Sequence, residues 1–183
     1  VILTITNSNY QWGNGTNVLR IPFTITEVVN SWSSTPTIPN WTYGKTPKIE
    51  TITATYSPVT VQYKLKTQGD EHYTTTLPTN AGSYVAKYYA SGSESYNELT
   101  EYVYFTIAKK DVIVPTLTNN TAIYTGSTIR AQIENPETDL YNLTENGWTN
   151  VGNYNVKLTL KDADNYKWEN RNSEPVLLPF SIT

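Results

Sequence analysis

The stretch VGNYNVKLTLKDADNYKW, at residues 151–168, decides the fold because its pattern occurs a second time in the chain. The stretch AGSYVAKYYASGSESYNE, at residues 81–98, has the same Gly-x-Tyr, a similar alternating run and the same later Tyr. Every second residue from Tyr154 to Leu160 is large and apolar, which is the period of a strand with one buried face. The repetition therefore predicts one β-hairpin that is present in two copies of a larger unit.

Each copy ends in a second alternating strand that closes on Phe-[Thr/Ser]-Ile. The phenylalanines of these closing strands are Phe23, Phe105 and Phe180. We divide the chain accordingly into an N-terminal segment (1–26), a middle unit (27–107) and a C-terminal unit (108–183). The N-terminal segment reads as the last two strands of an earlier copy, and we expect its Leu19, Ile21, Phe23 and Ile25 to face a core.

The Gly-x-Tyr element has a physical role in this pattern. Gly82 and Gly152 precede the hairpin strands, and we expect them to adopt positive φ in a tight turn. The tyrosine two residues later, Tyr84 or Tyr154, should enter the core and needs a partner for its hydroxyl. The element resembles the tyrosine corner of immunoglobulin-like (Ig-like) sandwiches. The sequence therefore predicts an all-β fold of tandem Ig-like β-sandwich domains, with Phe23, Phe105 and Phe180 as inward-facing structural residues.

An aromatic-Gly turn, the Gly-x-Tyr strand, the later Asn-Tyr and the closing Phe-Thr-Ile together resemble the bacterial Ig-like repeats called MBG domains. Such repeats occur in tandem in large surface and secreted proteins, often beside mucin-binding or leucine-rich-repeat modules. The resemblance covers nearly the whole chain, although residues 44–80 are longer than their counterpart 126–150. It implies a non-catalytic structural or adhesive module of a bacterial cell-surface or secreted protein. The expected partners are neighbouring repeats and a host or cell-surface glycan or protein, and no cofactor is expected.

Composition excludes several other classes of protein. The chain has 183 residues, a net charge of −3 and no cysteine. Disulfides and cysteine-ligated zinc are therefore excluded, and the basic face of a nucleic-acid-binding protein is missing. No apolar run reaches the length that a membrane-spanning helix needs, so we expect no membrane insertion in this segment.

The joins between copies contain neither Gly nor Pro. These joins are FTITEVVNSW at 23–32 and FTIAKKDVIV at 105–114. A join without a flexible spacer should be semi-rigid, so tandem copies should form a rod. Residues 1–26 should form a pair of strands, which is marginally stable alone and must pack on the next unit, another chain or another part of the first unit.

The sequence offers few candidate binding residues. Trp12 and Trp168 each follow a Tyr by two residues, and if exposed they would form a repeated platform on which sugar rings stack. The favoured interpretation is that they cap the ends of the sandwiches or pack at the interfaces between units, because aromatic residues dominate small cores. The alternative function is a glycan-binding module that uses exposed Trp and Tyr to bind mucin or a cell-wall polysaccharide.

Three polar candidates remain. Asp162 and Asp164 form a weak metal candidate, but Ca²⁺ requires six to eight oxygen ligands and we favour a plain solvated turn. The single histidine, His72, is interpreted as an exposed loop residue, because no hydroxyl and carboxylate are fixed around it. Lys109 or Lys110 could form an isopeptide bond with an asparagine, a reaction that requires a buried carboxylate between the two.

Overall fold

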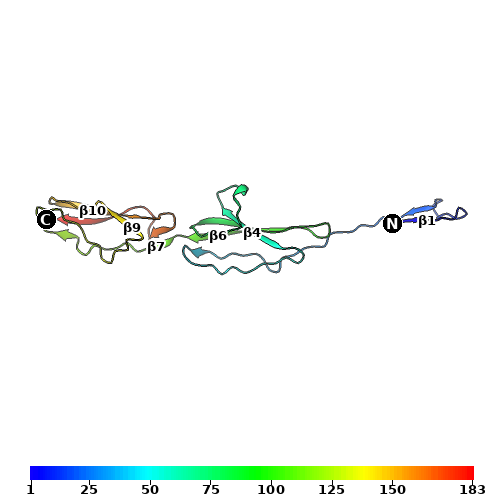
Figure 1. Cartoon of the computed structure of the whole chain (residues 1–183), viewed down its shortest axis with the longest axis horizontal. Helices are drawn as coiled ribbons and strands as arrows, with labels where there is room; N and C mark the ends of the chain where they lie inside the picture. The colour runs from blue at the N-terminus through cyan, green and yellow to red at the C-terminus, as the bar shows by residue number, and fades with distance from the viewer.

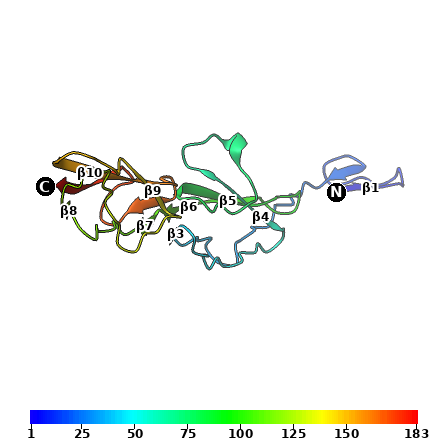
Figure 2. The ribbon, with the colours of Figure 1, turned by 60° about the vertical axis from the view of Figure 1, so that its left-hand side comes forward.

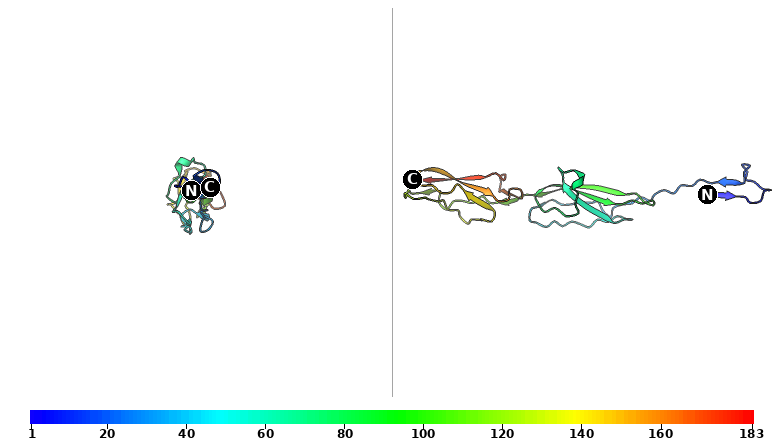
Figure 3. Two further views of the ribbon diagram at one scale, coloured as in Figure 1. Left: turned by 90° about the vertical axis from the view of Figure 1, so that its right-hand side faces the viewer. Right: turned by 45° about the horizontal axis from the view of Figure 1, so that its top comes forward.

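The β-strands of the chain account for its whole regular structure. The computed structural model describes residues 1–183, with twelve strands, one 3₁₀ turn and no α-helix. The prediction of an all-β fold is therefore confirmed, and its several sheets are consistent with a β-sandwich. The strands follow one another along a single long axis, which Figure 1 shows from the side and Figure 3 from one end.

The middle unit contains a four-stranded sheet in the order β3-β6-β5-β4. Its strands are β3 (Trp41–Thr42), β4 (Val59–Leu65), β5 (Gly82–Ala90) and β6 (Leu99–Ala108). Residues 27–40 and 43–58 run along one side of this sheet, β3 pairs with its closing strand, and residues 66–81 rise from the other side (Figures 1 and 2). We call residues 66–81 the excursion. It contains the 3₁₀ turn η1 (Asp70–His72) and accounts for the extra length of the middle copy.

The C-terminal unit repeats this arrangement with a sheet in the order β8-β12-β10-β9 and a second pair, β7 with β11. Its strands are β7 (Lys110–Val112), β8 (Thr121–Ala122), β9 (Tyr141–Thr144), β10 (Gly152–Leu160), β11 (Tyr166–Trp168) and β12 (Val176–Ile182). In both units the short first strand of the sheet runs parallel to the closing strand, and the hairpin strand runs antiparallel to it.

The two hairpins share one register. Tyr84 lies opposite Phe105 in β5 and β6, and Tyr154 lies opposite Phe180 in β10 and β12. The alternation predicted from sequence is confirmed on these strands, because Val156, Leu158 and Leu160 are buried while the residues between them are partly exposed. A shift of one residue would expose the whole apolar set, so the repeated pattern determines the register.

Each unit has its own apolar core. The buried cluster of the middle unit comprises Ile38, Ile52, Tyr84, Ala86, Tyr88, Phe105 and Ile107. The two clusters of the C-terminal unit comprise Val112, Tyr141, Leu158, Leu160, Trp168 and Val176, and Ala131, Val156, Phe180 and Ile182. None of the three clusters takes residues from both units.

The N-terminal segment forms the expected pair of strands, but its closing residues do not face a core. β1 (Ile2–Thr4) pairs with β2 (Val18–Arg20), and Leu3 lies opposite Leu19. Phe23 is 67% exposed, whereas Phe105 is 3% and Phe180 is 4% exposed. The expectation that Phe23 faces inward is therefore wrong in this structure, because no second layer covers a strand pair that ends at Arg20.

The exposure of Phe23 gives a matched pair of substitutions. Phe105→Ala should lower the free energy of unfolding by about 3–5 kcal/mol, because it empties a closed core. Phe23→Ala removes the same atoms from a solvent-exposed side chain and should change the free energy of unfolding by less than about 0.5 kcal/mol. Chemical denaturation followed by tryptophan fluorescence measures both. An equal loss from the two substitutions would show that Phe23 is buried in solution.

Candidate functional site

The Gly-x-Tyr element builds the same corner in both units. The Tyr84 hydroxyl donates to the Asn80 carbonyl oxygen at 2.9 Å, and the Tyr154 hydroxyl donates to the Asn150 carbonyl oxygen at 2.9 Å. Burial raises the pKa of the Tyr84 hydroxyl above the usual value for tyrosine, so this group stays a neutral donor. Each hydroxyl thus has the partner that we expected it to need, and this partner is the backbone carbonyl oxygen four residues upstream.

The glycines of the corner are needed for space. Gly82 and Gly152 do not have positive φ, so the expectation of a left-handed turn at these positions is wrong. A Cβ at Gly82 would lie 3.2 Å from Cε2 of Tyr84, and a Cβ at Gly152 would lie 3.0 Å from the hydroxyl oxygen of Tyr154. The ring of the tyrosine folds back over the glycine, and any side chain there would displace it.

A tryptophan stacks on the corner of each unit but comes from a different element. The stacked ring pairs, with their centroid separations, are Trp41–Phe105 (5.2 Å), Tyr84–Phe105 (5.5 Å), Trp148–Tyr154 (4.7 Å) and Trp148–Phe180 (5.7 Å). Trp41 lies opposite the closing isoleucine of its unit, a position that Ala122 occupies in the other. Trp148 takes the sequence position of Pro78. Trp41 and Trp148 each pack half-buried against the core of their unit, and Ala122 and Pro78 stand where the other unit has its tryptophan.

The corner of the middle unit also contacts the C-terminal unit. The side-chain carbonyl oxygen of Asn165 accepts a hydrogen bond from the Ala81 backbone N–H at 2.8 Å. Asn165 is only 8% exposed although it lies in the turn between β10 and β11. Tyr43 of the middle unit meets Tyr166 edge to face, with 5.4 Å between ring centroids. We call these four residues the junction.

The chain is continuous through the junction as well. β6 ends at Ala108 and β7 begins at Lys110, so a single residue separates the two strands. The Lys110 backbone N–H donates to the Asn165 carbonyl oxygen at 2.9 Å, which ties the linker to the same turn. Residues 21–27, where the N-terminal segment meets the middle unit, contain no strand, and Figure 1 shows them as a single extended stretch. The two joins therefore differ, although both lack Gly and Pro.

Trp12 and Trp168 hold turns. Trp168 is 0% exposed, and its indole N–H donates to the Glu174 carbonyl oxygen at 3.0 Å. The backbone of each tryptophan closes the same kind of turn. Its N–H donates to the carbonyl oxygen four residues later, and its carbonyl oxygen accepts from the N–H three residues later. The indole nitrogen of Trp12 is buried without a hydrogen-bond partner. Trp168 has no face on which a sugar could stack, so the platform of two exposed indoles is not formed.

The turn that contains the weak metal candidates Asp162 and Asp164 is held together by hydrogen bonds between Asp162 and Asn165. Both carboxylate oxygens of Asp162 accept hydrogen bonds from Asn165, one from its backbone N–H at 3.1 Å and one from its side-chain amide at 2.9 Å. Asp164 is exposed. The structure contains no group of three or more His, Cys, Asp or Glu side chains placed to hold a metal ion. Asp162 instead orients Asn165 toward Ala81, and so supports the junction.

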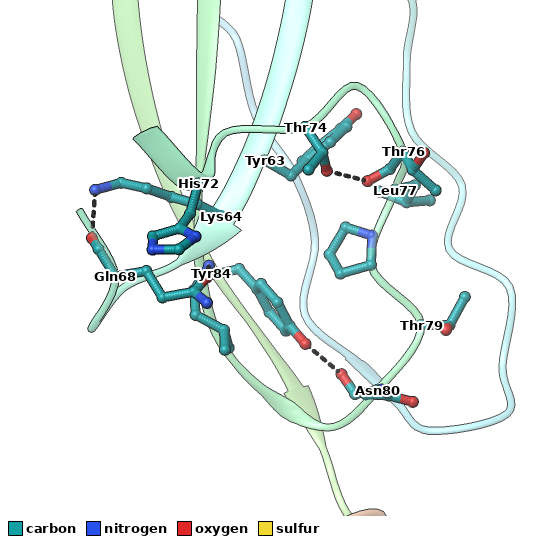
Figure 4. A pocket seen from close by; sticks show the side chains of 12 residues that line it. Tyr63, Lys64, Gln68, His72, Thr74, Thr76, Leu77, Thr79, Asn80 and Tyr84 are labelled. Atoms are coloured by element: carbon teal, nitrogen blue, oxygen red, sulfur yellow. Dashed lines mark hydrogen bonds between the residues drawn. The ribbon is translucent and has the colours of Figure 1, made fainter. Parts of the chain in front are cut away.

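A polar hollow of about 480 Å³ lies between β4, the excursion and the corner of the middle unit (Figure 4). Its polar groups are engaged with one another, because Tyr84 donates to Asn80 and the Lys64 ammonium donates to the Gln68 carbonyl oxygen at 2.7 Å. His72 borders the hollow with its side chain 53% exposed, and its Nε2 lies 3.3 Å from a carboxylate oxygen of Glu71. No hydroxyl is hydrogen-bonded to the imidazole, so the arrangement does not form a nucleophile–base pair.

The lysines considered for an isopeptide bond have other surroundings. The Lys109 ammonium donates to the Ala163 carbonyl oxygen at 2.6 Å and to the Ser173 hydroxyl at 3.1 Å. The side chain of Lys110 makes no hydrogen bond or ion pair. Neither lysine forms a hydrogen bond with the side chain of an asparagine. Lys109 instead joins the linker between β6 and β7 to the turns on both sides of β11.

No protein-family model matches the chain, and a search of curated proteins gave no match. No helix of the structure is long and apolar enough to span a bilayer.

The contact between the two units at the junction was not predicted from the sequence. Ala81 and Asn165 are 84 residues apart, so no local pattern could pair them. Asn-Tyr precedes the closing strand at 9–10 and at 165–166, whereas the middle unit has Ser95-Tyr96 there. An asparagine in a turn usually has a hydrogen-bonding task, so Asn165 itself was the available signal.

The junction can be tested with trypsin, which cleaves after Lys109 and Lys110 only when the linker opens. Asn165→Ala removes the acceptor of the Ala81 N–H, and losing a partner for a buried group costs about 1–3 kcal/mol. Cleavage at this site should therefore become about tenfold faster, while cleavage after Arg20 keeps its rate. Mass spectrometry of a time course measures both sites, and Asn153→Ala, on the exposed side of β10, is the matched control. If Asn165→Ala cleaves at the wild-type rate, the junction does not hold the linker closed.

Proposed function

We propose that the chain is a non-catalytic structural and adhesive module, a tandem of Ig-like β-sandwich domains in a bacterial cell-surface or secreted protein. The domains are residues 27–107 and 108–183, preceded by the closing strands of a similar repeat in residues 1–26. The observation that carries this proposal is the repeated corner, in which Tyr84 with Phe105 and Tyr154 with Phe180 have one register and one hydroxyl partner. Repeats of this kind stack end to end and give length at low cost in sequence.

The junction supports a role in which the module keeps a fixed distance between its two ends. A strand of nine residues spans about 30 Å, so each unit adds a length of that order along the axis seen in Figure 1. The contact of Asn165 with Ala81 and of Tyr166 with Tyr43 fixes one unit against the next. A chain of flexibly linked domains would collapse on average toward a smaller separation than a chain of docked ones. We infer that the docked arrangement holds a binding surface away from the cell.

The absence of cysteine makes the rod directly measurable, because two introduced cysteines would be the only labelling sites. The two substitutions are Ser91→Cys and Ser127→Cys. Ser91 lies in the loop between β5 and β6, and Ser127 follows β8, so the labels are on different units. Pulsed electron paramagnetic resonance between spin labels at these positions should give one narrow distance distribution. Insertion of four glycines after Ala108 should broaden it. A distribution that is already broad in the uninterrupted chain would contradict the proposed rod.

A further inference from the structure

The sheet of the middle unit has an outer face that its core does not use. This face consists of the outward-pointing residues of three paired strands, which lie in three rows across the sheet. The rows are Lys64–Val85–Tyr104, Gln62–Lys87–Tyr102 and Thr60–Tyr89–Thr100. We call it the tyrosine–lysine face.

The tyrosines of this face are not needed by the fold. Tyr104 is 64% and Tyr102 is 47% exposed. The corresponding positions before the closing Phe hold Pro179 and Leu177 in the C-terminal unit, and they hold Pro22 and Arg20 in the N-terminal segment. The closing strand β12 of the C-terminal unit therefore forms without aromatic residues on its outer face. Only the middle unit of the three places two exposed rings there.

Unpaired cations lie beside the rings. The Lys66 ammonium is 5.5 Å from the centroid of Tyr104, and the Lys87 ammonium is 5.5 Å from the centroid of Tyr89. Neither lysine has a carboxylate within ion-pair distance. The nearby acids have other partners, because Asp70 pairs with Lys64 at 2.9 Å and the Tyr89 hydroxyl donates to Glu98 at 3.4 Å. Lys66 therefore keeps a positive charge that is free to meet an anion, and the charge of Lys87 is offset only by the more distant carboxylate of Asp70.

The excursion forms a raised border along this face. Lys64 places its ammonium 5.1 Å from the Tyr73 ring centroid, and its pairing with Asp70 ties η1 to β4. This ion pair lowers the pKa of the Asp70 carboxyl below its ordinary value. Figure 2 shows the excursion standing out from the sheet on the side opposite residues 27–58. A ligand on the face would lie against Lys66 and Tyr73 on one side and over Tyr102 and Tyr104 on the other.

We propose that the tyrosine–lysine face binds an acidic polysaccharide whose pyranose rings carry carboxylates. The apolar C–H face of a pyranose stacks on an exposed aromatic ring, and Tyr102 and Tyr104 are spaced about 7 Å apart along β6 by the geometry of a strand. A carboxylate on such a sugar reaches the ammonium of Lys66 or Lys87, which lie next to the rings. Gln62, Thr60 and Thr100 supply hydrogen-bonding groups for the sugar hydroxyls. A protein partner that binds by apolar contact fits less well, because Val85 is the only aliphatic residue of the nine and is 5% exposed.

This inference rests on the adhesive part of the proposed function and gives it a ligand. It is tested by nuclear magnetic resonance titration of the full chain with a short oligogalacturonate, which carries a carboxylate on every ring. The amide shifts should change on β4, β5, β6 and the excursion. The methyl ester of the same oligomer has the same rings without charge and should bind at least threefold more weakly. Poly-L-glutamate, which has carboxylates without sugar rings, should leave these strands unchanged.

Paired variants separate the two kinds of contact. Replacing both tyrosines, Tyr102→Ala with Tyr104→Ala, should weaken oligogalacturonate binding at least tenfold. Lys66→Gln with Lys87→Gln should weaken it about threefold to tenfold and remove most of its dependence on salt. The controls are Tyr124→Ala, at a tyrosine that is 50% exposed elsewhere, and Lys157→Gln, the counterpart of Lys87 in the C-terminal unit. Both controls should keep the wild-type affinity.

Other results would overturn the proposal. Absence of shifts on this face, or binding that survives the double tyrosine variant, would exclude the face as the site. Equal binding of the methyl ester would exclude recognition of the acid, and equal binding of poly-L-glutamate would exclude recognition of the ring. The spin-label distance between the two units is independent of these variants. A failure of the binding test is therefore distinguishable from a failure of the rod.

Discussion

The structure of both units depends on a tyrosine ring that folds back over a glycine two residues before it. The ring enters the core beside the closing phenylalanine, and its hydroxyl reaches a backbone carbonyl four residues upstream. Those three contacts fix the loop before the strand, the start of the strand and its register with the next strand. Since a one-residue shift would turn every apolar side chain of the hairpin outward, little else is needed to define the sheet.

Because the corner defines the hairpin, the remaining surfaces of each unit are free to differ. The core accepts an indole from either of two positions, Trp41 in one unit and Trp148 in the other, with Ala122 and Pro78 in the vacant places. The outer face carries tyrosines in one copy and Pro or Leu in the other. The loop at Asn80 and Ala81, which the corner holds in position, becomes the surface on which the next unit docks. One element thus serves both the fold of a unit and its attachment to its neighbour.

The parts that sequence predicted are those set by local periodicity. The alternation from Tyr154 to Leu160, and that of the closing strand to Ile182, repeats every two residues and needs no knowledge of what lies opposite. The parts that sequence missed depend on distant partners. Phe23 has the same local pattern as Phe105 but no second layer, and Asn165 bonds to a residue 84 positions away. The sequence correctly placed the glycines in the corner. They are required because the tyrosine ring approaches them closely, and not because the backbone there is left-handed.

The central claim is that the same corner builds two cores that are stable on their own. Native-state hydrogen exchange of the full chain tests it most directly when one core is opened by Phe180→Ala. Phe180 is 4% exposed, and the loss of a buried phenylalanine costs about 3–5 kcal/mol, so amides of β10 and β12 should exchange more than a hundredfold faster, while those of β5 and β6 keep their protection. If the amides of β5 and β6 lose protection to the same extent, the two halves share a single core and the account is contradicted.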